Sequence, residues 1–244
     1  MIVSGFEGTC LNSRTEKLIA EQGIGGLILF ERNYENPKQL KKLIENLQSL
    51  TAQNLPPLFI SVDQEGGRVA RLNEPFTQFP PMCCLGEANS DDLAYRFGLA
   101  MGKEMQAVGI NMDYAPVLDV HSNPENPIIG KRAISSNPDV VARLGCKIIQ
   151  GFKDAGTFPV GKHFPGHGDT SQDSHLTLPR VERSKESLEK IELVPFAQAF
   201  QEGLDVIMTA HVVYPAWDED SAATFSNYIL NDLLRKKMQF QGLV

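Results

Sequence analysis

The segment at residues 162–175, KHFPGHGDTSQDSH, concentrates side chains that could do chemistry. It contains three histidines, two aspartates and a lysine, set among two glycines and a proline. Such side chains could bind a metal ion, cradle a phosphate group, form a Schiff base through Lys162 or relay a proton. The spacing of the residues bears differently on each of these alternatives.

The first three alternatives find limited support in the spacing. His163 and His167 are four residues apart, as two zinc ligands on a helix would be, but the proline and glycines around them disfavour a helix. A metal site would therefore need ligands that converge from a loop. The order G-x-x-x-x-G-K-[ST] of a phosphate loop is absent, and Asp169 would repel a phosphate. A Schiff base at Lys162 would require a lowered lysine pKa.

A proton relay is the fourth alternative. Asp173 and His175 are two residues apart, so in an extended segment their side chains point the same way. The carboxylate could then hold the imidazole, fix its tautomer and raise its pKa. Such a histidine can give a proton to a leaving group and later take one from water. The competing interpretation is a surface loop in which the two residues have no joint role.

Strand-like and helix-like segments alternate along the chain. Short apolar runs predict strands, and apolar residues at helical spacing predict the helices between them. Asn36 and Pro37 have the residue types of a helix cap and first helical position, and a helix at 185–202 should adjust at Pro195. We expect strands at 2–6, 25–30, 58–62, 109–113, 159–163 and 205–210, and helices at 37–50, 92–108, 138–155, 185–202 and 226–238, the last capped by Ser226.

This alternation indicates an α/β fold with parallel strands and helical crossovers. A doubly wound sheet and a (β/α)8 barrel both fit, but no G-x-G-x-x-G follows the first strand. A barrel would bring to one mouth the polar residues at the ends of different strands. Because residues 242–244 resemble the start of a seventh strand, we expect one TIM-like barrel domain over 1–244 that lacks its C-terminal units. The strand-end residues are Asp63, Asp119, Lys162, His163 and His211.

Composition narrows the classes of partner. The formal net charge of −7 and the pI of about 5.3 argue against a general nucleic-acid surface. The first residues lack a basic region followed by an apolar stretch, and no apolar run reaches the length of a membrane helix, so we expect neither a secretion signal nor a membrane partner. The four cysteines lack zinc or disulfide spacing, which indicates free thiols in a reducing cytoplasm.

Several motifs together resemble one family. The pattern K-H-F-P-G-H-G, four residues, then D-S-H at 162–175 resembles the signature of bacterial family 3 glycoside hydrolases of the β-N-acetylglucosaminidase (NagZ) type. The resemblance covers essentially the whole chain. Further matching runs are GGLILFERN at 25–33, SVDQEGGRVAR at 61–71, NMDYAPVLD at 111–119, MTAHV at 208–212 and ATFS at 223–226.

The resemblance implies a retaining mechanism in which an aspartate attacks the anomeric carbon. It implies that His175, paired with Asp173, is the acid/base, and that no cofactor or metal is needed. A neutral base would not repel the nucleophilic carboxylate. The residues that match the family's sugar-binding positions are Asp63, Arg71, Arg132, Lys162 and His163, although Ala133 and Ile134 replace the serine and phenylalanine that usually follow Arg132.

The family's nucleophile follows its seventh strand, so we expect it just beyond residue 244 and expect this chain alone to be inactive. The implied activity is removal of terminal β-linked N-acetylglucosamine, from muropeptide fragments during cell-wall recycling in the cytoplasm. Two alternatives stay open: a sugar-binding remnant without catalysis, and a metal-dependent hydrolase.

Overall fold

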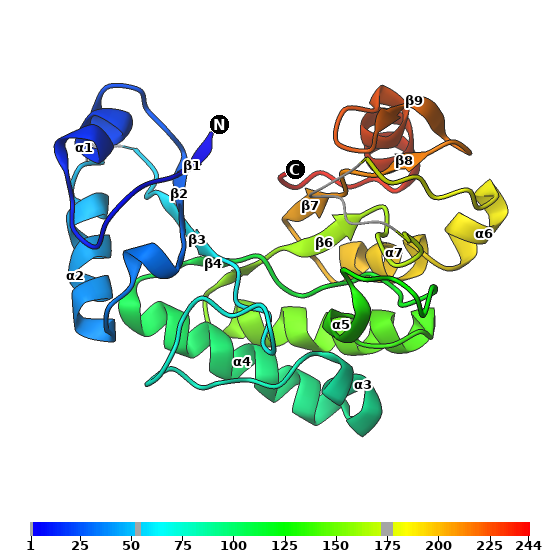
Figure 1. Ribbon diagram of the computed structural model, residues 1–244, viewed down its shortest axis with the longest axis horizontal. Helices are drawn as coiled ribbons and strands as arrows, with labels where there is room; N and C mark the ends of the chain where they lie inside the picture. Colours follow the sequence, from blue (N-terminus) through cyan, green and yellow to red (C-terminus); the bar gives the residue numbers. More distant parts are fainter. Residues whose placement is uncertain (1, 52–54, 172–177) are drawn as a thin grey trace.

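A computed structural model describes residues 2–51, 55–171 and 178–244. Strands and helices alternate through most of this range, as the sequence predicts (Figure 1). Polar loops at one end of the strands carry the predicted site residues.

The strands form two parallel sheets whose members follow chain order. The larger sheet has the order β1-β2-β3-β4-β5, and the smaller pairs β6 with β7. A parallel bridge between Val117 and Lys162 links the two sheets, and another joins Val206 to Leu243. The strands are β1 Val3–Gly5, β2 Gly26–Leu29, β3 Phe59–Val62, β4 Met112–Asp113, β5 Phe158–Pro159, β6 Gly161–Phe164 and β7 Ile207–Thr209.

The helices begin where the sequence supplies caps. Asn36 accepts a hydrogen bond from the backbone of Gln39, and Pro37 occupies the first turn of α2, so both expectations for this helix are confirmed. Its leucine and isoleucine stripe is buried. The helices are α1 Ser13–Ala20, α2 Pro37–Gln48, α3 Cys83–Ala88, α4 Asp91–Val108, α5 Pro138–Asp154, α6 Lys185–Lys190 and α7 Leu193–Gln201, with short 3-10 turns at Glu31–Asn33 (η1) and Gly130–Arg132 (η2).

Helices α4 and α5 lie side by side beneath the strands (Figure 1). Their close approach depends on glycine. A Cβ atom on Gly98 would lie 2.2 Å from the carbonyl oxygen of Ile148, and one on Gly151 would lie 2.2 Å from that of Tyr95. Backbone therefore packs on backbone at this crossing, which leaves no room for a side chain.

Several expected elements differ from the structure. The strand expected at 109–113 covers only Met112–Asp113, because Gly109 still caps α4. The strand expected at 159–163 is two strands, because the chain changes partner at Val160, whose N–H lies within hydrogen-bond distance of the carbonyls of both Asp113 and Ala115. The helix expected at 185–202 is interrupted after Lys190 and resumes at Leu193. Pro195 consequently sits in the first turn of α7, where its missing N–H removes no intrahelical bond.

The C-terminal part also differs from the expectation. The antiparallel pair β8 Val213–Tyr214 and β9 Asp218–Ala222 was not expected. The last helix, Tyr228–Lys237 (η3), has π-helical rather than α-helical bonding. Ser226 precedes it and accepts a hydrogen bond from Ile229 N at 3.2 Å, as expected of a cap.

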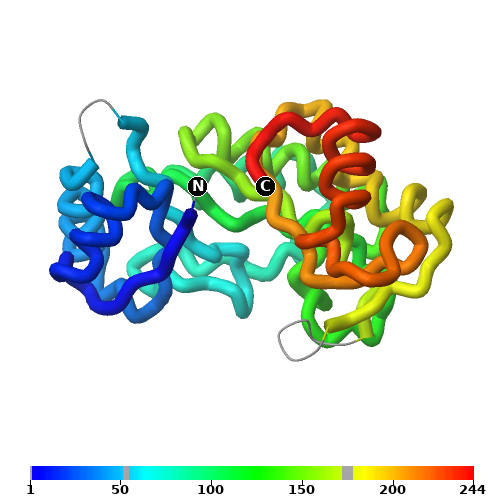
Figure 2. The backbone as a smooth tube through the Cα atoms, turned by 90° about the horizontal axis from the view of Figure 1, so that it is seen from above, coloured from blue at the N-terminus to red at the C-terminus, as the bar shows by residue number. Residues whose placement is uncertain are grey.

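Among the described residues, three hydrophobic clusters fill the interior. The first packs β2 and β3 against helices α2, α4 and α5, and the second lies between β6, β7, α7 and η3. A small third cluster consists of Met112, Val160 and Val206. Seen from above, the N-terminal third and the C-terminal third occupy opposite ends of the molecule (Figure 2). In the part of the chain described, no helix combines the length and apolar character needed to cross a membrane.

We predict that Gly151→Val destabilises the fold by about 1–3 kcal/mol, because the new side chain must push α4 away from α5. Urea unfolding followed by circular dichroism measures this free energy. Gln150→Val on the exposed face of the same helix is the control and should cost less. Equal losses for the two variants would contradict the close-packing account.

Candidate active site

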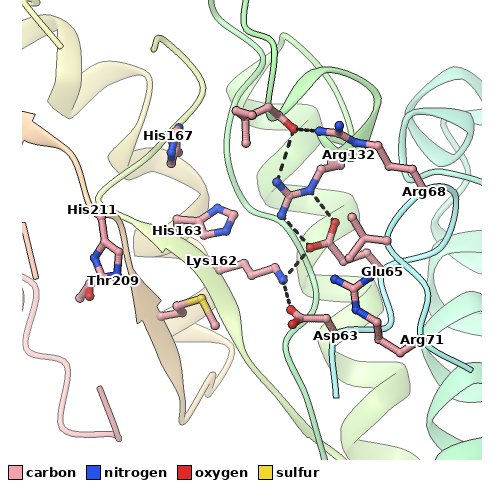
Figure 3. Close-up of a pocket in the computed structure, with 13 residues that line it drawn as sticks. Asp63, Glu65, Arg68, Arg71, Arg132, Lys162, His163, His167, Thr209 and His211 are labelled. Carbon is pink, nitrogen blue, oxygen red and sulfur yellow. Dashed lines mark hydrogen bonds and ion pairs between the residues drawn. The ribbon is translucent and has the colours of Figure 1, made fainter. Parts of the chain in front are cut away.

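A cavity of about 600 Å³ opens where the C-terminal ends of β3, β6 and β7 meet the loops that follow them. All five residues predicted to bind sugar line it. Figure 3 shows carboxylates and guanidinium groups on one side and histidines on the other. The lining residues are Asp63, Glu65, Arg68, Val69, Arg71, Ile128, Arg132, Lys162, His163, His167, Met208, Thr209 and His211.

Lys162 is the centre of the polar wall. It extends from β6 and is only 2% exposed, yet it carries a charge. Its Nζ lies 2.9 Å from Asp63 Oδ1 and 2.6 Å from Glu65 Oε1 (Figure 3). Burial disfavours the ammonium form, but Glu65 and Asp63 outweigh burial and raise the pKa of Lys162. A Schiff base would need the neutral amine, so this environment opposes that alternative.

Glu65 was not singled out from the sequence, although it joins two of the predicted residues. It is 1% exposed and receives two hydrogen bonds from Arg132, at 2.8 Å from Nε and 2.7 Å from Nη2. Burial would raise the pKa of Glu65, but Lys162 and Arg132 hold it at about 2. A signal existed in the sequence: Asp63 and Glu65 are two residues apart, so in an extended run they face the same side.

The loop after β3 folds back and delivers Arg71 to the cavity. Gln64 anchors it: its backbone N–H donates to Asp113 at 3.0 Å, and its Oε1 accepts from Arg71 N at 2.8 Å. Gly66 turns the chain with a φ of +90°, and a Cβ there would lie 2.5 Å from the carbonyl oxygen of Pro80. The sequence requires glycine here because both the dihedral angle and the space exclude a side chain.

The arginines differ in how they are occupied. Arg132 donates hydrogen bonds from Nε and Nη2 to Glu65, which fixes the guanidinium plane at the cavity wall. Arg68 donates to the carbonyl of Ile128. Arg71 Nε is buried and has no hydrogen-bond partner within the described residues. Its Nη1 lies 3.9 Å from the exposed carboxylate of Glu31, a weak pair that a molecule in the cavity could replace.

A second buried carboxylate, Asp119, sets the orientation of His163. Asp119 Oδ2 lies 2.7 Å from His163 Nδ1, and Oδ1 accepts from the backbone N–H groups of His163 and His167. Burial would raise the pKa of Asp119, but His163 brings it to about 2. Because an ionised carboxylate only accepts, Nδ1 of His163 must carry the proton, and Nε2 is the ring nitrogen left for the cavity.

The opposite wall comes from β7 and the residues after it. His211 Nδ1 lies 2.6 Å from Thr224 Oγ1, which is also 2.9 Å from Thr209 Oγ1. His167 is more deeply placed, and its Nδ1 lies 2.9 Å from Thr170 Oγ1. Burial lowers the pKa of His167.

Trp217 is buried against Tyr214 and does not line the cavity, which agrees with a packing role.

Asp173 and His175, the predicted proton relay, lie outside the described residues, and their assignment stays a prediction. The described residue Asp169 pairs with Arg183 at 2.7 Å. Within 2–51, 55–171 and 178–244, no three His, Cys, Asp or Glu side chains are grouped so as to hold a metal ion.

The sequence of residues 4–244 matches the family described as the glycosyl hydrolase family 3 N-terminal domain. The chain belongs to this family. This confirms the family resemblance that the sequence motifs indicated.

Similar proteins carry consistent names. A beta-hexosaminidase of Alkalilimnicola ehrlichii is 41% identical and is matched over 100% of this chain and 70% of its own length. A beta-hexosaminidase A of Pseudoalteromonas piscicida is also 41% identical, but this chain spans only 42% of it.

Solved structures of family 3 enzymes are also similar to this chain. A family 3 beta-N-acetylglucosaminidase from a Paenibacillus species has a TM-score of 0.96 and 44% identity, over 99% of this chain and 46% of that one. NagZ from Neisseria gonorrhoeae in complex with N-trifluoroacetyl-D-glucosamine has a TM-score of 0.93 and 37% identity, over 99% and 72%.

We predict that Glu65→Ala lowers the free energy of unfolding by about 3–5 kcal/mol. The substitution removes the buried carboxylate that pairs with both Lys162 and Arg132, so each cation loses a partner. Asp92→Ala, which breaks the exposed pair with Arg96, is the control and should cost less than about 1 kcal/mol. Chemical unfolding at pH 7 measures both. A loss for Glu65→Ala no larger than the control would show that the buried pairs do not stabilise the site.

Proposed function

We propose that this chain forms the sugar-binding part of a retaining glycoside hydrolase that removes terminal β-linked N-acetylglucosamine. The observation that carries the proposal is the cavity in which Lys162 holds Asp63 and Glu65 by ion pairs and Asp119 holds the ring of His163. The names of the relatives and the N-acylated glucosamine in the Neisseria complex support the sugar class.

The proposed binding follows from the free atoms of each group. Asp63 is partly exposed and uses Oδ1 on Lys162, so its Oδ2 can accept from sugar hydroxyls. Nε2 of His163 faces the same ligand, and Lys162 can donate a further hydrogen bond. Arg71 and Arg132 are assigned to the hydroxyl and acetamido oxygens. These contacts would hold a neutral ring in a fixed orientation, which favours reaction at its anomeric carbon.

For the chemistry, His175 paired with Asp173 is proposed as the acid/base. The two carboxylates of the cavity wall are poor nucleophiles. Glu65 is buried and its charge is shared by Lys162 and Arg132, and Asp63 is also bound to Lys162. We therefore place the nucleophilic aspartate in a segment after residue 244 and expect the 244-residue chain alone to be inactive.

The fold proposed for the complete catalytic unit is a TIM-like (β/α)8 barrel, with residues 1–244 forming one domain that contains six of its units and the start of a seventh strand. Two observations support it: neighbouring strands pair in chain order from β1 to β5 and from β6 to β7, with the Val117–Lys162 bridge joining the two sheets, and Leu243 continues this order by its bridge to Val206. In Figure 1 the two chain ends face each other across the middle of the molecule.

The biological substrate is proposed to be a muropeptide fragment bearing terminal N-acetylglucosamine, cleaved in the cytoplasm during cell-wall recycling. A sugar-binding protein without catalysis is the alternative outcome. It would share the cavity described above and differ only in turnover.

The test is hydrolysis of an aryl β-N-acetylglucosaminide. We expect turnover from a version extended by the segment that follows the matched region in the Alkalilimnicola ehrlichii relative, and none from residues 1–244. In the extended protein, His175→Ala should lower kcat by about 10²- to 10⁴-fold, because proton transfer to the leaving group is lost. Asp220→Asn, at an exposed position, is the control and should leave kcat unchanged.

Turnover by residues 1–244 that His175→Ala abolishes would contradict the placement of the nucleophile. Sugar binding without turnover in the extended protein would favour the non-catalytic alternative.

A further inference from the structure

A buried carboxyl group lies directly beneath the turn that carries the cavity histidines. Glu192, between α6 and α7, is 1% exposed. Its Oε1 accepts a hydrogen bond from Ser122 Oγ at 2.8 Å, whereas its Oε2 is buried with no hydrogen-bond partner among the described residues. A Cβ added to Gly166 would lie 2.6 Å from Oε2 and 2.7 Å from the Glu192 Cβ, so the side chain packs against the Gly166 backbone.

Gly166 is the point from which this turn is held. Its N–H donates to the carbonyl of His163 at 2.7 Å, and its own carbonyl accepts from Tyr214 Oη at 2.5 Å. The next residue, His167, donates its N–H to Asp119, the carboxylate that also orients the His163 ring. A steric clash or an added charge next to Gly166 would therefore act on the backbone segment that positions the imidazole of His163.

Burial and two neighbouring carboxylates oppose the ionisation of Glu192. The charged and titratable neighbours are Asp119, Asp169, Arg183 and Tyr214. Burial raises the pKa of Glu192 to about 8; the Ser122 hydrogen bond and Arg183 act against this, while Asp119 and Asp169 add to it. A raised pKa favours the protonated carboxyl at neutral pH, and in that form Asp119 does not face a second negative charge beneath the same turn.

We propose that Glu192 is a positioning residue of the active site, whose carboxyl group supports the turn at residues 163–169 from below and keeps His163 aligned for sugar binding. This inference rests on the proposed function. Ionisation of Glu192 adds a buried negative charge next to Asp119 and Asp169, which disturbs the turn and weakens sugar binding. The sugar site consequently loses affinity on the alkaline side of neutrality.

The contribution of Glu192 to the free energy of unfolding decreases as pH rises. The folded-state pKa of Glu192 lies above its ordinary value of 4.5, so the folded protein binds the proton more tightly than the unfolded chain. The contribution of Glu192 is fully present below about pH 4.5 and is lost as pH rises through about 8. Glu192→Gln keeps the shape of the side chain but cannot ionise, so this part of the pH dependence should disappear.

The test follows the ring nitrogens of His163 by NMR between pH 6 and 9.5, in the 244-residue chain and two variants. Wild type should show a transition centred near pH 8. The transition should be absent in Glu192→Gln and retained in Glu189→Gln, a control on the neighbouring turn whose carboxylate pairs with Lys237. A transition that is the same in wild type and Glu192→Gln would overturn the proposal.

One further variant and a binding measurement separate an effect of Glu192 from a failure of sugar binding. Ser122→Ala removes the hydrogen bond that favours the ionised carboxylate, so the midpoint should move to higher pH; an unmoved midpoint would also overturn the proposal. By calorimetry, the affinity of wild type for N-acetylglucosamine should fall about tenfold from pH 6.5 to 9.0, and that of Glu192→Gln should not. If wild type binds no sugar at either pH, the proposed function fails, while the NMR transition still reports on Glu192.

Discussion

The buried ammonium of Lys162 is the constraint on which the rest of the site depends. An ion of this size taken out of water costs several kcal/mol unless opposite charges surround it. The loop after β3 meets this need with Asp63 and Glu65, and Glu65 in turn fixes Arg132 from η2. One lysine on β6 thereby ties together three segments that are distant in sequence and determines which polar atoms remain free in the cavity.

Asp119 is the buried carboxylate that holds polar groups in place on the histidine side of the cavity. It holds one imidazole and two backbone N–H groups, so His163 is oriented before any ligand arrives. Preorganised donors and acceptors lose little entropy on binding and suit a ligand rich in hydroxyl groups. Glu192 extends the arrangement by one layer, because it contacts the turn through Gly166 rather than the cavity itself.

Local signals were enough to predict much of the architecture. The cap at Asn36 and the parallel strand order follow from residue types and apolar spacing. The change of partner at Val160 and the π-helical end of the chain could not be predicted, because both depend on contacts with remote segments. The site followed the same rule: strand-end residues converged as expected, whereas Glu65 and Glu192 were missed because their importance comes from burial among particular neighbours. The pairing of Asp173 with His175 remains a prediction.

The most direct test of the central claim is calorimetric titration of the 244-residue chain with N-acetylglucosamine, beside Asp63→Asn and the exposed control Asp220→Asn. The account predicts that wild type and the control bind alike, and that Asp63→Asn weakens binding by about 10- to 100-fold through loss of a charged hydrogen-bond acceptor. Absence of binding by the folded wild type, or equal affinity for Asp63→Asn, would contradict a sugar site built around Lys162.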